Sequence, residues 1–305
     1  MAILIARLGQ AVLVVFALTG IVFTLIHIAP GDPTDLLVPE HAPAEFREMM
    51  KKSYGLDDPF YVQYGRFIQN AIRGDLGESF QYRVPAMALV IERLPATAEL
   101  AIAGMAIATI SGLIIGIIGA VFRNHFVDHF SSVLTYLAVS MPNYWIGLLL
   151  IWIFSVKLGV LPVSGRAGFE HLILPAFSLG IGLMPPVARI VRSSMIEVML
   201  EDFVWTARAK GVTEWQIMLF HVLRNALIPV VTIIGMYIGV LLGGAAIIET
   251  IFGWPGAGRL VLQAAQFQDF PLVIAGVLVL SISVLVTNLI VDFLYVLIDP
   301  RMRVR

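Results

Sequence analysis

Long apolar runs separated by short polar segments dominate the chain. A transmembrane helix needs about 20 consecutive apolar residues, and six runs reach or approach this length. They cover residues 8–29, 97–122, 130–156, 172–190, 226–249 and 272–298. The pattern predicts an all-α polytopic membrane protein with six transmembrane helices, forming a single membrane domain over residues 1–305.

The fourth run is interrupted by Pro175, Pro185 and Pro186. Proline lacks a backbone donor, so a proline-containing span needs neighbouring helices or water to satisfy the carbonyl groups that it frees. We therefore expect this helix to be packed inside a bundle.

Residues 30–95 form the longest polar segment. Amphipathic stretches at 43–55 and 61–74 are joined by turn-forming clusters at 30–33 and 57–59, which favour short helices over a folded enzyme domain. We expect these helices to pack on the outer face of the bundle.

Composition supports the membrane assignment. The 305 residues are 59% hydrophobic and 13% charged, and the mean hydropathy is +0.89. The absence of cysteine excludes disulfides and thiolate chemistry. Lys and Arg outside the 30–95 loop are concentrated in segments that are cytoplasmic if the N-terminus is cytoplasmic, so both termini are predicted to face the cytoplasm.

Catalytic and metal-binding motifs are largely missing. No Gly-Lys dipeptide occurs, which excludes a P-loop for ATP. His125 and His129 have the spacing of a helical metal pair with Asp128 between them, but no third ligand lies nearby, and a solvated loop is the alternative. The serines lack GxSxG or SxxK contexts. We predict no catalytic residue, no metal site and no cofactor in this chain.

Ionisable residues inside the spans discriminate between classes of transporter. His27, Glu99 and Asp292 lie near the ends of their predicted helices, where each side chain can reach an interface. No chain of carboxylates or histidines crosses the membrane as a proton relay would require. This pattern disfavours a proton-driven carrier.

A few polar or small residues are candidates for a solute path or gate. Asn143 follows Pro142 in the third run, where a proline frees a carbonyl and the amide offers a polar group. Bonding to a neighbouring helix is an equally good interpretation of such side chains. The remaining candidates are Ser283 and Asn288 in the last run and Gly243 and Gly244 in the fifth.

Residues 201–229 form a basic segment between the fourth and fifth runs. A short helix is predicted over 201–210, Gly211 ends it, and Thr213 with Gln216 forms a capping box that begins a second helix. Ala207, Ala209 and Gly211 are expected at the exposed tip, beside Arg208 and Lys210. This elbow could dock into a groove on another protein. The alternative interpretation is an ordinary basic cytoplasmic loop without a binding role.

The same segment resembles the cytoplasmic EAA loop of binding-protein-dependent ABC importer permeases, particularly the dipeptide, oligopeptide and nickel branch. The resemblance extends through nearly the whole chain. It is carried by Thr206-Ala207-Arg208-Ala209-Lys210-Gly211, Asn225-Ala226-Leu227-Ile228-Pro229, Pro30-Gly31-Asp32-Pro33, Gly55-Leu56-Asp57-Asp58-Pro59, Gly74-Asp75-Leu76-Gly77, Arg93-Leu94-Pro95, Glu249-Thr250-Ile251-Phe252, Pro255-Gly256-Ala257-Gly258 and Asp299-Pro300-Arg301. Trp205 stands where the broader family has a glutamate, so that glutamate's role does not transfer.

The resemblance implies a type I ABC importer permease in the bacterial inner membrane. It implies a first helix (1–29), an extracytoplasmic loop (30–95) and a five-helix transport core (96–298) with a coupling segment (196–225). Thr206 to Gly211 would contact the ATPase. The expected partners are a second permease, two ATPase subunits or an ATPase heterodimer that binds ATP and Mg²⁺, an extracytoplasmic solute-binding protein and the lipid bilayer, without nucleic acid.

Di- or oligopeptides are the first expected substrate, with nickel chelates or glutathione as alternatives. A carrier that acts alone, or a membrane scaffold without a transport path, are hypotheses from other classes.

Overall fold

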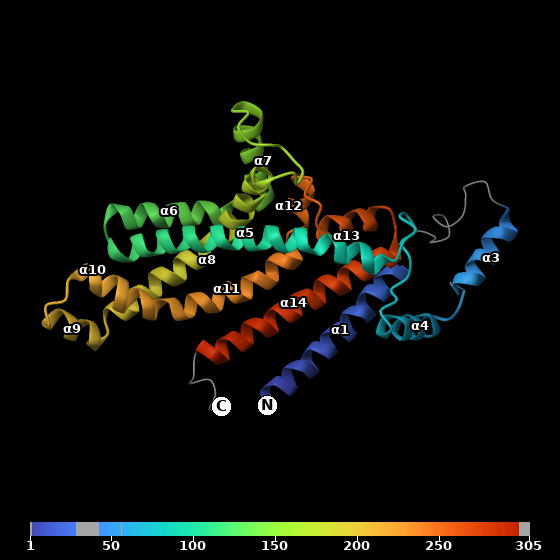
Figure 1. Cartoon of the computed structure of the whole chain (residues 1–305), viewed down its shortest axis with the longest axis horizontal. Helices are drawn as coiled ribbons and strands as arrows, with labels where there is room; N and C mark the ends of the chain where they lie inside the picture. Colours follow the sequence, from blue (N-terminus) through green and yellow to red (C-terminus); the bar gives the residue numbers. More distant parts are fainter. Residues whose placement is uncertain (1, 29–42, 56, 299–305) are drawn as a thin grey trace. The chain divides into compact units, whose positions relative to one another are not determined.

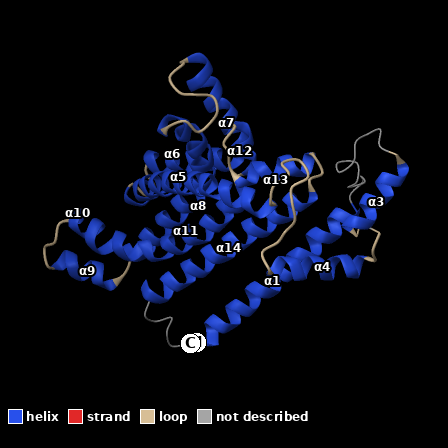
Figure 2. Ribbon diagram, turned by 45° about the vertical axis from the view of Figure 1, so that its right-hand side comes forward, coloured by secondary structure: helices blue, strands red, loops and turns tan. Residues whose placement is uncertain are grey.

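The computed structural model describes residues 2–28, 43–55 and 57–298 (Figure 1). The chain divides into two compact units, Met1–Thr97 with Pro255–Val286 and Ala98–Trp254 with Thr287–Arg305. Every regular element in this described part is a helix (Figure 2). The extended pairing among these residues is an isolated bridge between Glu78 and Pro85. The all-α prediction is confirmed. The predicted turn at 30–33 and the motif at 299–301 lie outside the described residues.

The first unit is built on two small cores. In one, Phe23 packs against Ile274 and Leu278, and the ring of Tyr64 lies 5.4 Å from that of Phe23. The other joins apolar residues near the start of α5 to α13 and to the first turns of α14. The helices of this unit are α1 (Ala2–Ile28), α3 (Ala44–Tyr54), α4 (Phe60–Ile72), α13 (Ala257–Gln266) and the beginnings of α5 (Ala86–Val121) and α14 (Phe270–Ile298).

A buried carboxylate holds the loop between α4 and α5 within this unit. Asp269 is fully buried and accepts hydrogen bonds from the Ser79 hydroxyl and from the backbone N–H groups of Phe80 (3.1 Å) and Gln81 (3.2 Å). Because a buried carboxylate requires such donors, loop and α14 are fixed together.

The second unit is organised around α8 (Phe169–Met199), which contacts most of the other helices in the unit. The helix continues through its three prolines and has the largest buried share of the spans (56%), so its predicted place inside a bundle is confirmed. The surrounding elements are α6 (Phe126–Ser140), α7 (Asn143–Leu150), the π-helix η1 (Ile151–Lys157), α9 (Asp202–Ala209), α10 (Glu214–Gln216), the π-helix η2 (Ile217–Leu223), α11 (Arg224–Gly244) and α12 (Ala246–Ile251).

Small residues let α5 approach α8 closely. A Cβ atom on Gly112 would lie 2.7 Å from Val187, and one on Gly116 would lie 2.6 Å from Val191. These glycines belong to a four-residue ladder with Gly104, the type of spacing that brings two membrane helices into backbone contact.

Four described helices are long and apolar enough to cross a membrane, or five if one bent pair is counted as a span, so the predicted number of six is not confirmed. The third predicted span, 130–156, is wrong as a single helix because α6 and α7 meet at an angle of 100°. Pro142 lacks an N–H group and forces Met141 into an extended conformation (φ −99°, ψ 127°), so α6 ends at Ser140. Within α1, the described apolar helix is Val12–Thr24.

Candidate functional site

The elbow between α9 and α10 has the helix–glycine–helix form predicted from the sequence. Gly211 has φ +79°, its N–H bonds the Arg208 carbonyl (3.0 Å), and the Val212 N–H bonds the Ala207 carbonyl (3.2 Å). This pair of bonds is a Schellman motif, which places a left-handed residue just after a helix and favours glycine there. The backbone at Gly211 is therefore defined by hydrogen bonds on its α9 side.

The start of the second helix differs in one detail from the prediction. Thr213 is the residue before α10, as expected, but its side chain makes no capping bond to the backbone. Its hydroxyl instead bonds the Gln216 side-chain oxygen (3.0 Å). The predicted capping box is wrong, because the two side chains satisfy each other.

The inner face of the elbow is part of the core of the second unit. Val204 of α9 and Ile217 and Val222 of η2 are fully buried. They pack in one cluster with Met195 of α8 and Ala226 of α11. A displacement of the elbow would expose this apolar surface, so α9 and α10 are held to the two long helices that flank them.

Burial also corrects the predicted position of one residue. Ala207 is 8% exposed and lies in this core, whereas the sequence analysis placed it at the exposed tip. The cause is the period of α9, which puts Ala207 on the same face as Val204. Thr206, Ala209, Lys210 and Gly211 are exposed, as expected.

The outer face of the elbow combines charge with large aromatic side chains. The Arg208 guanidinium lies 5.1 Å from the centre of the Trp205 ring and 2.7 Å from the Glu214 carboxylate. The hydrogen bond that Arg208 donates to the Glu214 carboxylate raises the pKa of Arg208 further, so the arginine stays charged. Trp205 (59%) and Trp215 (72%) are widely exposed. Exposed apolar surface of this kind marks interaction sites.

An ion pair between a buried aspartate and a half-buried arginine joins α6 to α8 in the same unit. Arg192 donates two hydrogen bonds of 2.8 Å to Asp128, and the Asn124 N–H donates a third (3.0 Å). Asp128 is only 4% exposed. Such a two-pronged arrangement fixes both distance and orientation.

The break between α6 and α7 opens a cavity of 320 Å³. Asn143 lines it, together with Arg189 of α8 and Tyr237 of α11. The predicted pathway residue Asn143 thus lies beside two polar residues that the sequence analysis did not select. The signal that could have identified Arg189 is its charge inside an apolar run.

The other predicted path or gate residues do not line this cavity. Gly243 is exposed, and Gly244 is the last residue of α11. The Ser283 hydroxyl bonds the Val279 carbonyl (2.7 Å) within its own helix, and Asn288 is exposed on α14.

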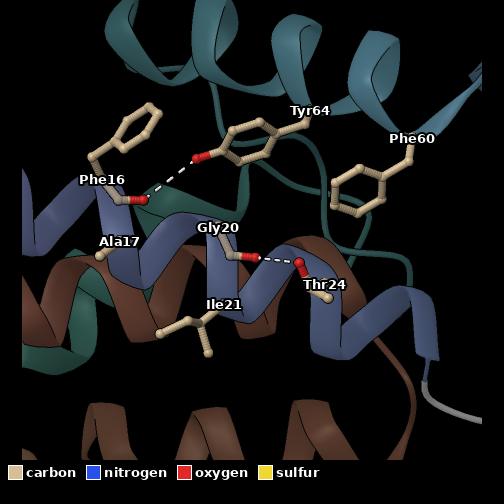
Figure 3. A pocket seen from close by; sticks show the side chains of 7 residues that line it. All are labelled: Phe16, Ala17, Gly20, Ile21, Thr24, Phe60 and Tyr64. Atoms are coloured by element: carbon tan, nitrogen blue, oxygen red, sulfur yellow. Dashed lines mark hydrogen bonds between the residues drawn. The ribbon is translucent and has the colours of Figure 1, made fainter.

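A groove between α1 and α4 in the first unit has a different character (Figure 3). Phe16, Ile21 and Phe60 give it an apolar lining. Its hydroxyl groups already have partners, because Tyr64 bonds the Phe16 carbonyl (3.4 Å) and Thr24 bonds the Gly20 carbonyl (2.7 Å). The groove therefore offers shape but no free polar group from these side chains.

Comparison with known proteins places the chain in a family. Residues 112–304 match the family described as binding-protein-dependent transport system inner membrane component, and residues 1–101 match the N-terminal region of such membrane components. The glutathione transport system permease protein GsiC of Escherichia coli is 41% identical over 98% of both chains. The protein of the same name from Shigella flexneri is 40% identical over the same shares.

Solved structures agree at the level of the fold. A chain of the MetNI methionine ABC transporter in an inward-facing conformation superposes with a TM-score of 0.59 at 19% identity, covering 70% of this chain and 97% of that one. A chain of an amino acid ABC transporter crystallised with histidines gives 0.53 at 19% identity, over 68% and 93%. With the family matches spanning nearly all of its length, the chain belongs to the binding-protein-dependent transport system inner membrane components, the permease subunits of ABC importers.

Proposed function

We propose that this permease imports glutathione, and that its elbow transmits the motion of a cytoplasmic ATPase to the membrane helices. Di- or oligopeptides are the first substrates expected from the sequence, with nickel chelates or glutathione as alternatives. The names of the relatives at about 40% identity favour glutathione, which is itself a short peptide.

The observation that carries the coupling role is the two-sided construction of the elbow. Its inner face shares a core with α8 and α11, while its outer face exposes Trp205, Trp215 and a charged arginine. A partner that binds the outer face would move α8 and α11 with it, because the inner face has no room to slip against a close-packed core. Thr206, Ala209, Lys210 and Gly211 would form the contact, with Ala207 supporting it from below.

The chain requires partners for this activity. It has no P-loop, so ATP and Mg²⁺ would be bound by two ATPase subunits or an ATPase heterodimer. A second, similar permease would complete the path, and an extracytoplasmic binding protein would deliver the solute. The complex would lie in the bacterial inner membrane with both termini of this chain in the cytoplasm, an orientation that reporter fusions at the two ends would test.

The test is ATP hydrolysis by the reconstituted complex of this chain, its second permease and its ATPases. Glutathione-loaded binding protein is expected to stimulate hydrolysis and to support uptake of labelled glutathione into proteoliposomes. Binding protein loaded with a dipeptide, and empty binding protein, are the controls. Stimulation by the dipeptide alone would restore the peptide assignment, and uptake of glutathione without ATPase subunits would overturn the importer mechanism in favour of a lone carrier.

A further inference from the structure

The cavity at the α6–α7 break gathers polar groups inside a region of the chain that is otherwise apolar. Arg189 lies within the candidate span Phe169–Met199, and Tyr237 lies within Glu214–Leu241. Asn143 is the first residue of α7. A charged side chain in a membrane span is costly and is usually retained for a function.

None of these three side chains makes a hydrogen bond or ion pair with another residue in the described part of the chain. The contrast with Arg192 is direct, since that residue lies one turn further along α8 and has both ends of its guanidinium bound to Asp128. Arg189, which is exposed and lines the cavity, therefore has no counter-charge among the described residues.

The start of α7, which carries Asn143, is fastened to α8 through the backbone. The buried Ser178 hydroxyl donates to the Asn143 carbonyl (2.8 Å), which fastens the start of α7 to α8. The amide lies directly over Gly182, where a Cβ atom would collide with it. Absence of a side chain at Gly182 is what allows the amide to sit at the cavity wall.

The chemistry of the three groups is that of a carboxylate site. A guanidinium matches a carboxylate with parallel N–H donors, and an amide and a phenol add a donor each. The volume of 320 Å³ is at the lower end of the range of about 300–1,000 Å³ found for small-molecule sites. A ligand of the size of a short peptide is appropriate, and glutathione carries two carboxylates.

We propose that Arg189, Asn143 and Tyr237 form a carboxylate-binding subsite on the translocation path, with Arg189 as the residue that selects for the negative charge. The proposal rests on the transport function proposed above. It assigns to the permease a selection step that is separate from recognition by the binding protein.

The experiment measures ligand binding to the whole complex in lipid nanodiscs. The binding protein is left out, so that its own selectivity does not affect the result. Glutathione, its dimethyl ester and dialanine are titrated by calorimetry against wild type and Arg189→Gln. The variant is expected to bind glutathione and dialanine about tenfold more weakly, as for loss of a charge-assisted hydrogen bond, while binding of the ester is unchanged. Arg189→Lys should recover part of the affinity. Asn143→Asp should weaken the binding of glutathione and dialanine, because the added negative charge repels their carboxylates.

Arg123→Gln is the matched control, because Arg123 is exposed in the turn between α5 and α6 and does not line the cavity. If Arg189→Gln weakened the binding of the dimethyl ester as much as that of glutathione and dialanine, or changed the binding of none of them, the proposed subsite would be overturned. Failure of wild type to bind any of the three ligands would do the same. Carboxylate-dependent binding of dialanine without binding of glutathione would leave the subsite standing and reject glutathione as the substrate.

Discussion

The elbow and the α6–α7 break are both built on α8, yet they treat polar groups in opposite ways. At the elbow, Arg208 is paired with Glu214 and the backbone is closed by a Schellman motif over a buried core. At the break, the side chains of Arg189 and Asn143 line a cavity and have no hydrogen-bond partner in the described part of the chain. The first region is internally satisfied, and the second is not.

The difference agrees with the two roles proposed above, coupling for the elbow and solute binding for the break. A segment that transmits movement must resist deformation, which a satisfied backbone and a close-packed core provide. A segment that receives a solute must keep polar groups available, which leaves them unpaired until the ligand arrives. Each of the following substitutions changes one of these properties in one region.

The largest effect is expected from Gly211→Val, which should abolish stimulated ATP hydrolysis while the protein still inserts. A β-branched residue at φ +79° is strained by about 1–3 kcal/mol, and a Cβ at this position has no heavy atom within 4 Å, so the side chain projects into the docking surface. The measurement is ATP hydrolysis by the reconstituted complex with loaded binding protein.

Gly74→Val is the matched control for strain, because Gly74 has φ +80° and equally open surroundings in the loop between α4 and α5. Gly211→Asn, which tolerates the left-handed conformation, separates strain from steric blocking. Normal stimulation in Gly211→Val, or equal loss in Gly74→Val, would remove the special role of the elbow.

The next effect is expected from Asp128→Asn, which leaves Arg192 charged without its partner. Loss of one member of a buried pair costs roughly 3–5 kcal/mol, and we expect about 2 kcal/mol because the Arg192 side chain remains 36% exposed. Thermal unfolding in nanodiscs measures this loss. Asp58→Asn, which breaks an exposed pair with Arg66, should cost under about 1 kcal/mol, and an equal cost for both would show that burial of Asp128 is unimportant.

Hydrophobic runs and local turn chemistry were enough to predict the helical fold, the central place of α8 and the form of the elbow. Local signals cannot report what a helix face meets, which is why Ala207 was placed at the surface and is buried. The sequence predicted one span over 130–156, because the angle at Pro142 depends on how α7 docks on Ser178 and Gly182 of α8, which local signals do not report.

The cavity shows the same limit. Asn143 was selected because it follows a proline, but Arg189 was counted only as one of the basic residues that set orientation, and Tyr237 carried no signal. Their proximity to Asn143 comes from α8 and α11 packing side by side, which is a tertiary fact.

A moderate effect is expected from Gly182→Ala. The added methyl group would displace the Asn143 amide from the cavity wall, so uptake should fall several-fold while unfolding temperature changes little, because the amide can rotate away. Gly65→Ala in α4 is the control, since a Cβ there meets nothing within 4 Å and alanine favours a helix. Unchanged uptake in Gly182→Ala would mean that the placement of Asn143 does not matter for transport.

The smallest effect is expected from Glu214→Gln. The pair with Arg208 is exposed on the glutamate side (62%), and exposed ion pairs contribute about 0–1 kcal/mol. If the buried face of the elbow gives it rigidity, stimulated ATP hydrolysis should stay near the wild-type rate. Val204→Ala opens a space in the buried core on the inner face of the elbow, and it should clearly reduce stimulated ATP hydrolysis. The reverse order, with coupling lost in Glu214→Gln and kept in Val204→Ala, would mean that the outer ion pair and not the core holds the elbow for its partner.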